Sequence, residues 1–495
     1  MSRRHSNGHA GRGVNRRNFL KASAASAFLF GAGAKTAHAE TGALANPSQG
    51  GARNIIFLVS DGMSMGTLTA AEHMLQRKEG RESHWGKLYR ERSGEVRRGV
   101  MDMAPLNSIV TDSAAAASSW GCGHRIMNGA LNMSPDGEPY PTILEHFRDA
   151  GKGTGLVTTT RITHATPSGF SINMESRGQE DEIAAQYAER DYDLLMGGGN
   201  RHFDPDMRGD GEDIYARFEA EGYHVVRNKE GMNNLPADGK VLGIYDNSHL
   251  PYTLDHVNTP NLLENVPTLA EMTEAALERL SGNGDGFLLQ VEGGRVDHAA
   301  HSNDVGGLIY DQIAFDDAVG VALAFQEEHP DTLVIITTDH GNANPGLNAA
   351  GSGYERSNTD FDRIQNFTHT NNWILGGLNS DSSVPDIIER VEEATAIEIN
   401  ETRAGILQDA LRGDHDAVYG VMSGSSPTLG QILANYTSFN WIGTVHTADY
   451  VELCATGPGS EAIGAFTRNT ALFDVMLESA GVDRIQTAKR PYAMV

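Results

Sequence analysis

Four side chains that could bind a metal ion lie close together in the sequence: Glu292, Asp297, His298 and His301. They follow the apolar run 286–292, which has the composition of a buried strand of a parallel sheet, and such strands carry functional groups at their carboxyl ends. Asp297 and His301 are four residues apart, so a helix that begins near them would place both on one face. Carboxylate and imidazole on one face favour a divalent transition metal, zinc above all.

Two further apolar runs end in a similar way. The run 331–338 is followed by Asp339 and His340, and the run 54–60 is followed by Asp61. A single carboxylate after a strand is usually a turn residue. Three such strand ends, two of them with histidine nearby, instead predict one shared site, because the carboxyl ends of parallel strands meet at one edge of the sheet.

Ser113 is the candidate nucleophile. The four alanines that follow it favour a helix that begins at Asp112 or Ser113. The amino terminus of a helix offers free N–H groups and a favourable dipole to an anion, although simple helix capping is the structural alternative for both residues. No Gly-x-Ser-x-Gly elbow surrounds Ser113, which argues against a Ser-His-Asp hydrolase. A metal ion could activate the hydroxyl by stabilising its alkoxide.

The elements that must position these residues alternate along the chain from residue 54 onward. This alternation predicts an α/β fold with a doubly wound, mostly parallel central sheet and helices on both faces. Strands are expected over 156–161 and 192–196, and helices over 141–150, 181–190, 267–280 and 309–328.

The length of the chain favours one large core with insertions over several small domains. We expect the core to comprise 54–341 and 441–495, and 342–440 to form a cap or crown insertion. Within that insertion, the polar segment 342–372 is typical of a long loop, and 383–436 has an acidic helical pattern.

The charge balance excludes one class of partner. The chain of 495 residues has 39 Lys and Arg residues against 65 Asp and Glu residues, a formal net charge of −26. Nucleic acid is therefore not expected as a partner, because binding a phosphate backbone requires a basic surface. An anionic small substrate would need local cations at its site, which bound metal ions would supply.

The amino terminus has the organisation of an export signal. A twin-arginine motif at 15–21 is followed by the apolar stretch 22–34 and by the small-residue exit at 37–39. We therefore expect 1–39 to be a signal peptide, 40–53 to be a flexible lead-in, and the protein to be periplasmic or secreted. No later segment has about 18 uninterrupted apolar residues, so no membrane span is expected.

The two cysteines, Cys122 and Cys454, lie far apart in the sequence. An exported protein could pair them, but nothing in their spacing requires a disulfide. Buried free thiols are the favoured interpretation.

The chain resembles the alkaline phosphatase family in seven motifs that occur in the order typical of the family. The segment 111–115 with 128–130 is similar to the nucleophile segment of these enzymes. The other six motifs are Asp61-Gly62, Thr163-His164-Ala165-Thr166-Pro167, Val291-Glu292-Gly293, Asp297–His301, Asp339-His340-Gly341 and His446-Thr447. Together the matching residues span 54–480.

The resemblance implies hydrolysis of small phosphate monoesters through a phosphoserine on Ser113, with two zinc ions and one magnesium ion as cofactors. It also implies a homodimer, which is the usual form in the family. The implied ligands are Asp297, His301 and His446 for one zinc, Asp61, Asp339 and His340 for the other, and Asp61, Thr166 and Glu292 for magnesium. The chemistry of the residues agrees, since imidazole-rich sets suit zinc and an all-oxygen set suits magnesium.

The resemblance also implies roles for four more residues. Arg177 would bind two phosphate oxygens with its guanidinium fork, and Asp112 would hold Arg177 in position. His164 and His298 stand where a well-known bacterial form has Asp and Lys, and they are expected to act through water near the magnesium and the phosphate. These two histidines leave the identity of the third metal open.

Three other classes of protein agree less well with the sequence. A sulfatase would carry a Cys/Ser-x-Pro-x-Arg pattern, which is absent around Ser113, and a phosphodiesterase would lack Arg177 or part of the third metal set. A non-catalytic phosphate- or metal-binding protein would have lost Ser113 or Arg177.

His369 also precedes a threonine and could pass for the last zinc ligand, but a surface or cap histidine is the favoured interpretation. His446 is preferred because a strand and the segment 457–459 follow it.

Overall fold

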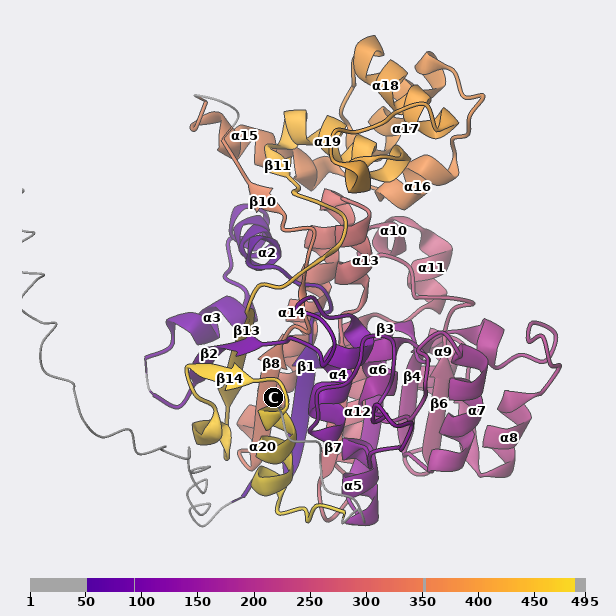
Figure 1. The fold of residues 1–495 in the computed structure, drawn as a ribbon, viewed down its shortest axis with the longest axis vertical. Helices are drawn as coiled ribbons and strands as arrows, with labels where there is room; N and C mark the ends of the chain where they lie inside the picture. Colours follow the sequence, from indigo (N-terminus) through magenta and orange to yellow (C-terminus); the bar gives the residue numbers. More distant parts are fainter. Residues whose placement is uncertain (1–50, 93, 350–352, 486–495) are drawn as a thin grey trace, which may run out of the picture. The chain divides into compact units, whose positions relative to one another are not determined.

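A ten-stranded sheet forms the core of the computed structural model, which describes residues 51–92, 94–349 and 353–485. The strand order is β14-β2-β13-β8-β1-β7-β3-β4-β6-β5 (Figure 1). The strands are β1 Asn54–Val59, β2 Arg97–Asp102, β3 Gly153–Arg161, β4 Leu194–Gly198, β5 Tyr223–Val226, β6 Lys240–Ile244, β7 Phe287–Glu292, β8 Thr332–Thr337, β13 Val451–Thr456 and β14 Phe466–Arg468. All neighbouring pairs are parallel except the two made by β13, which runs antiparallel to β8 and β2.

Helices cover both faces of this sheet, which confirms the predicted fold class. Along β1, Ile56 and Leu58 belong to one hydrophobic cluster, whereas Ile55, Phe57 and Val59 belong to the other. This alternation is that of a strand buried on both sides. The first cluster includes α2 Met65–Lys78, α3 His84–Arg90, α12 Leu269–Leu280, α13 Arg295–His301 and α14 Val305–Glu328, and the second includes α4 Ser113–Cys122, α5 Ile143–Asp149, α7 Glu180–Arg190, α8 Ile214–Ala220 and α20 Ala471–Ala480.

The helix boundaries follow from their caps. The Thr268 side chain accepts a hydrogen bond from the Glu271 N–H, and the Glu271 carboxylate accepts one from the Thr268 N–H, so α12 begins with a full capping box. The helix α14 begins earlier than the apolar pattern predicted, because Asp304 caps it by accepting a hydrogen bond from the Gly307 N–H at 2.9 Å. The apolar pattern locates a helix, while the cap determines its first residue.

The predicted loop over 342–372 is wrong for its second half. The structure contains α15 Arg356–Asp362, a 3-10 turn η2 Arg363–Asn366 and α16 Asn371–Gly376 in this segment. Few apolar residues mark these short elements in the sequence. Phe361, Ile364, Phe367 and Ile374 are buried in the main core, and Trp373 and Leu375 pack against it partly buried. Their packing partners lie in distant parts of the chain, so no local pattern revealed them.

The helices expected over 383–436 are present. They are α17 Val384–Thr395, α18 Glu401–Arg412 and α19 Ser425–Thr437, and Figure 1 shows them in orange, grouped with α16. The remaining elements are short: α6 Ala165–Gly169, η1 Asn200–His202, α9 Lys229–Asn233, α10 Thr253–Asn258, α11 Pro260–Asn265, β9 Gly341–Asn342, β10 Gly346–Leu347, η3 Gly420–Met422, β11 Phe439–Asn440, β12 His446–Thr447 and η4 Ser460–Ala462.

The remaining predictions concern the cysteines, a membrane span and the amino-terminal segment. Cys122 and Cys454 are both buried and unpaired, which confirms the prediction of free thiols. Across 51–92, 94–349 and 353–485, no helix has the length and apolar character needed to cross a membrane. The predicted signal peptide 1–39 and most of the lead-in 40–53 lie outside the described residues.

Glycine brings two helices of the site into backbone contact. A Cβ atom at Gly121 in α4 would lie 1.9 Å from the carbonyl oxygen of Gly169 in α6, and a Cβ at Gly169 would lie 2.6 Å from the Ala117 Cβ. No side chain larger than hydrogen fits at either position. The approach matters because α4 carries Ser113 at its first turn and α6 follows His164.

We expect Gly121→Ala to destabilise the protein by about 1–3 kcal/mol, because the added methyl group forces α4 away from α6. Gly405→Ala is the matched control, since Gly405 lies within α18 and a Cβ there meets no atom within 4 Å. That control should gain about 0.5–1 kcal/mol from helix propensity. Urea unfolding of both variants tests the pair, and equal midpoints would contradict the packing argument.

Candidate active site

Three adjacent strands bring the predicted carboxylates to one edge of the sheet. The strand β1 lies between β8 and β7, and its last residue, Val59, is in register with Thr337 and with Glu292. Asp61 and Asp339 follow two residues beyond these ends, and both are fully buried, as is Glu292. The predicted convergence of strand ends is thus observed.

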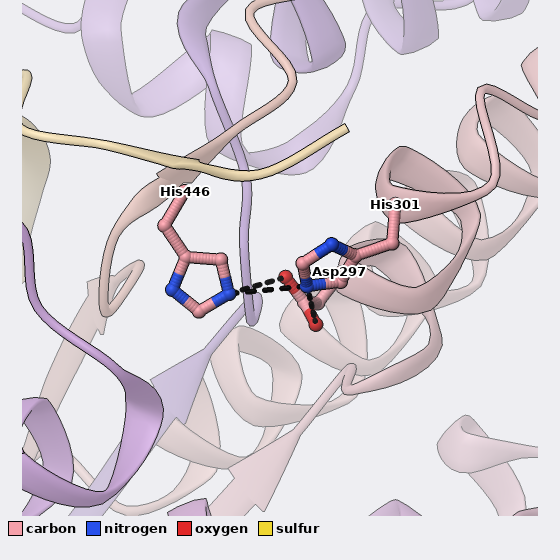
Figure 2. A group of neighbouring side chains, drawn as sticks. All are labelled: Asp297, His301 and His446. Carbon is pink, nitrogen blue, oxygen red and sulfur yellow. Dashed lines mark hydrogen bonds and ion pairs between the residues drawn. The ribbon is translucent and has the colours of Figure 1, made fainter. Parts of the chain in front are cut away.

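The first group of potential ligands consists of Asp297, His301 and His446 (Figure 2). The His301 Nε2 lies 3.3 Å from Asp297 Oδ2 and 3.1 Å from the His446 Nε2, which in turn lies 3.7 Å from Asp297 Oδ1. Asp297 and His301 come from α13, one helical turn apart, as their spacing predicted. His446 comes from β12, far along the chain, and Figure 2 shows its ring facing the other two side chains.

The outer nitrogens of these two histidines are held by backbone carbonyl groups. The His301 Nδ1 lies 2.6 Å from the Thr444 oxygen, and the His446 Nδ1 lies 2.9 Å from the Thr111 oxygen. A carbonyl oxygen only accepts, so each Nδ1 carries a proton, and each Nε2 is the nitrogen left to bind a metal ion in place of a proton. Two such nitrogens and a carboxylate that face one another are a donor set for a cation, in the arrangement typical of metal-ligating histidine.

Burial and the charges of neighbouring residues shift the pKa values of all three residues in this group. Burial alone would raise the pKa of Asp297, but His301 and His446 hold it well below its usual range. Burial opposes protonation of His301, yet the Asp297 carboxylate raises the pKa of that imidazole to about 9. Burial and the neighbouring His340 lower the pKa of His446 to about 4. The carboxylate and the two imidazoles therefore interact strongly across this small space.

The second group consists of Asp61, Asp339 and His340, with ligand atoms within 4.8 Å of one another. The His340 Nε2 lies 3.1 Å from Asp339 Oδ2 and 3.6 Å from Asp61 Oδ1, and these two carboxylate oxygens are buried without a hydrogen-bond partner. Burial, with the charges of Asp339 and Asp297, holds the pKa of Asp61 well above its usual range. Buried carboxylates without donors are costly, and a bound cation removes that cost.

The third group differs in part from the expected set. Asp61, Glu292 and His164 have ligand atoms within 4.8 Å of one another. Thr166, the expected ligand, donates to Asp61 Oδ2 at 3.4 Å. Sequence reasoning gave His164 only an indirect role, although it follows the end of β3 much as Asp61 follows β1. Its Nδ1 is buried without a partner, as is Glu292 Oε1, so both atoms are available to an ion.

The other oxygen of Glu292 is held by two threonines that sequence reasoning missed. Glu292 Oε2 accepts hydrogen bonds from the hydroxyls of Thr158 and Thr160, both on β3. Burial is the main reason why the pKa of Glu292 rises to about 7. No motif marks these threonines, and their role follows from the pairing of Thr158 with Glu292 across β3 and β7.

Ser113 stands at the amino terminus of α4, next to the second group. Its Oγ lies 3.2 Å from the His340 Nε2, and the side chain is almost fully buried. Asp112 caps the helix, because its Oδ1 accepts from the Ala115 N–H at 2.9 Å. The hydroxyl therefore lies where the helix dipole favours negative charge, within reach of a metal-binding group.

Arg177 lies beside the nucleophile, held on two sides. Its Nη1 lies 3.2 Å from Asp112 Oδ2, and its Nη2 lies 3.1 Å from the His164 Nε2. The Gly129 N–H also donates to Asp112 Oδ2 at 3.0 Å, which fixes the carboxylate that orients the guanidinium. The contact between Asp112 and Arg177 is the one expected from the sequence.

A histidine that sequence reasoning missed lies against this part of the site. The ring centroid of His249 lies 4.3 Å from that of His298 and 5.6 Å from that of His164. His249 follows β6 in a loop without any motif, so no sequence signal marked it. His298 lies 2.9 Å from the Arg295 guanidinium, and burial together with Arg295 lowers the pKa of His298 to about 3. The imidazole of His298 is accordingly neutral.

His369 takes no part in this site. Its Nδ1 lies 3.2 Å from Asp255 Oδ1, and its ring stacks on Trp373 with centroids 4.2 Å apart. None of the metal-binding groups in the described residues includes it. The interpretation of His369 as a cap histidine agrees with these contacts.

Comparisons of sequence and of structure with known proteins all match alkaline phosphatases. A family model described as alkaline phosphatase matches residues 52–482. Alkaline phosphatase 4 of Bacillus subtilis (strain 168) is 28% identical over 452 residues, which cover 89% of this chain and 91% of that protein. The crystal structure of Thermus thermophilus alkaline phosphatase has a TM-score of 0.82 and 33% identity, covering 91% of this chain and 96% of that chain.

A third comparison concerns the fold alone. A variant of the alkaline phosphatase from the Antarctic bacterium TAB5, solved with magnesium bound, has a TM-score of 0.62 and 22% identity. The likeness covers 88% of this chain and 99% of that chain.

Metal binding at the third group should release a proton from Glu292 below pH 7. The pKa of Glu292 is about 7 in the ion-free site, so an ion must displace the proton there, and affinity should fall by about tenfold per pH unit below pH 7. Titration calorimetry in two buffers of different ionisation enthalpy measures the protons released. Glu292→Gln, which carries no titratable proton, should release about one proton fewer at pH 6, and equal release by both proteins would refute this assignment.

Proposed function

The chain belongs to the alkaline phosphatase family and is a phosphoric monoester hydrolase, and we propose that it works through a phosphoserine intermediate on Ser113. The observation that carries the proposal is the position of the Ser113 hydroxyl. It lies between a helix amino terminus and a group of buried carboxylate and imidazole atoms that lack hydrogen-bond partners. The hydroxyl is thus surrounded by groups suited to a cation and to a phosphate.

We propose two zinc ions and one magnesium ion as cofactors. Asp297, His301 and His446 would hold one zinc, in keeping with their two facing Nε2 atoms. The other zinc would be held by Asp61, Asp339 and His340, and the magnesium by Asp61, Glu292 and Thr166. Bound zinc ions supply positive charge that stabilises the serine alkoxide and the oxygen of the departing alcohol.

His164 has two possible roles at the third site. It would either act through water or bind the ion directly, because its unpartnered Nδ1 belongs to the same group as Asp61 and Glu292. A nitrogen ligand favours a softer ion than magnesium, so this side chain decides which metal the third site prefers.

The reaction has two displacements at phosphorus. In the first, the Ser113 hydroxyl loses its proton to solvent and Oγ forms a bond to phosphorus while the bond to the alcohol oxygen breaks, and that oxygen takes up a proton from solvent as the alcohol leaves. In the second, water attacks the phosphoserine, inorganic phosphate leaves and the serine hydroxyl is restored. Arg177 binds two of the nonbridging oxygens through both displacements, oriented by Asp112. The amino terminus of α4 favours the added negative charge at Ser113.

Two features favour a monoesterase over a diesterase. A monoester has three nonbridging oxygens, so two can contact the Arg177 fork while the third faces the metal-binding groups, whereas a diester has only two and would have none left for the metal ions. The third metal group is also complete, since Asp61 and Glu292 are buried together with unpartnered oxygens. A phosphate with a single ester bond satisfies both.

The remaining features of the protein are proposals from the sequence. The signal 1–39 would direct export by the twin-arginine route to the periplasm or beyond the cell. The core would comprise 54–341 and 441–495, with 342–440 as an insertion that carries α15 to α19. A homodimer is the proposed assembly, and small phosphate monoesters are the proposed substrates.

Ser113→Ala should lower kcat/KM for p-nitrophenyl phosphate by about 1,000-fold or more, because the variant has no oxygen to accept the phosphoryl group. Ser119→Ala is the control on the same helix, since its buried hydroxyl only donates to the Ala116 oxygen at 2.6 Å. Both proteins are assayed over pH 7–11 after metal removal and again with zinc and magnesium restored. Acid quenching followed by mass spectrometry should show phosphate on Ser113 in the wild type, and a fully active Ser113→Ala would disprove the route.

Arg177→Ala should lower kcat/KM by about 10- to 100-fold, since it removes a charge-assisted hydrogen bond to the phosphate. Arg177→Lys should restore only part of this loss, because an ammonium group cannot contact two oxygens in one plane. Arg77→Ala is the control, since Arg77 forms a partly exposed ion pair with Asp362. Steady-state kinetics separates KM from kcat, and full activity in Arg177→Lys would contradict the bidentate contact.

A further inference from the structure

Three segments joined by hydrogen bonds beside His301 and His446 carry exposed apolar side chains. The six residues that we call the entrance rim are all at least one-third exposed: Ile109, Val110, Tyr419, Val421, Ile442 and Val445. Building on the proposed function, we propose that the entrance rim binds an apolar alcohol group, so that the preferred substrates are phosphate monoesters of alkyl or aryl alcohols.

One part of the rim comes from the insertion and touches the segment that leads to His446. A Cβ at Gly443 would lie 3.8 Å from Tyr419 Cε1 and 4.0 Å from Val421 Cγ2, so both side chains lie against this glycine. The Thr444 hydroxyl donates to the Val421 oxygen at 3.0 Å. Tyr419 and Val421 therefore belong to the same surface as the neighbouring Ile442 and Val445.

This part of the rim is tied directly to the first metal-binding group. The Thr444 oxygen accepts the hydrogen bond from the His301 Nδ1 at 2.6 Å, and Val445 immediately precedes His446. Val445 is therefore one residue away from His446, and Thr444 links the same segment to His301.

The other part of the rim comes from the segment before the nucleophile. The His446 Nδ1 donates to the Thr111 oxygen at 2.9 Å, which brings Val110 and Val445 to adjacent positions on the two joined segments. The Val110 oxygen accepts from Asn128 Nδ2, and Asn128 Oδ1 accepts from the Asp112 N–H. Hydrogen bonds thus connect Val421, through the segment of Thr444 and His446, to Val110 and the cap of α4.

The chemistry of the site makes the alcohol group the occupant of this surface. Arg177 and the helix amino terminus hold the phosphate oxygens in the proposed reaction. Ser113 attacks from beside His340 of the second group, so in-line displacement places the departing oxygen on the opposite side, toward the first group. The carbon atoms attached to that oxygen then extend over the rim. A chain with a net charge of −26 repels a second anionic group on the substrate, whereas an uncharged apolar group gains from contact with these side chains.

The test compares ethyl phosphate with hexyl phosphate, both below the micellar range, on the metal-replete protein. The two leaving alcohols have nearly the same acidity, so a difference in kcat/KM reports contact with the alkyl chain. We expect hexyl phosphate to be favoured by about tenfold or more, because four additional methylene groups are partly removed from water.

The double variant Tyr419→Ser/Val421→Ser should reduce this preference to about threefold or less. The control is Val257→Ser/Leu263→Ser, which removes two similarly exposed apolar side chains from α10 and α11 and should keep the full preference. Thermal unfolding and sedimentation of all three proteins accompany the kinetics. Exposed positions of this kind have little effect on stability, so the fold should be retained.

Each result of this comparison leads to a different conclusion about the entrance rim or the proposed function. A wild type that hydrolyses both esters at the same kcat/KM overturns the rim proposal and leaves the phosphatase proposal intact. A preference that survives in the Tyr419→Ser/Val421→Ser protein also overturns it. A change from dimer to monomer in that variant would assign the rim to contact between two copies of the chain instead. Failure to hydrolyse either ester would count against the proposed function itself.

Discussion

The burial of like charges at one edge of the sheet is the constraint on which this structure depends. Asp61, Asp339 and Glu292 are fully buried, and each has a carboxylate oxygen without a hydrogen-bond donor. Burial disfavours the charged form of Asp61, and the neighbouring carboxylates repel it further, so the pKa of Asp61 lies well above its usual range. Only positive charge at this edge makes the arrangement favourable, and in the ion-free protein protons have that role.

The rest of the fold holds these groups at fixed positions. The central strands β8, β1 and β7 are buried on both faces, so the backbone at their ends cannot move apart to relieve the repulsion. On one face, the close contact of α4 with α6 through Gly121 and Gly169 brings Ser113 to the same edge. Rigid packing thus preserves an electrostatic arrangement that flexible loops would lose.

The site combines two kinds of recognition that are separated in space. The inner part is charged and buried, and it would distinguish a phosphate monoester by charge and by the fork of Arg177. The outer part is apolar and exposed, and it is formed by segments on both sides of His446. The insertion contributes Tyr419 and Val421 to the outer part, whereas its first residue, Asn342, donates to Asp297 Oδ1 at 2.7 Å. Changes at Tyr419 and Val421 can therefore alter substrate preference without removing a contact to a metal ligand.

The sequence by itself determined the fold class and most of the site. Short apolar runs followed by Asp61, Glu292 and Asp339 are local patterns, and strand burial on both faces leaves a clear signal in each run. The one-turn spacing of Asp297 and His301 predicted their shared helix face for the same local reason. The order of the motifs then linked Ser113 and Arg177 to these groups.

The tertiary structure alone decided which distant side chains meet. His164 joins Asp61 and Glu292 directly, whereas the sequence predicted only an indirect role for it. Thr158 and Thr160 hold the Glu292 carboxylate and His249 packs against His298, and no local pattern marks these three residues. The short helices α15 and α16 likewise owe their existence to buried contacts with remote elements. Local patterns report the preferences of neighbouring residues, whereas these contacts depend on how separate segments pack, and that is decided by the free energy of the whole fold.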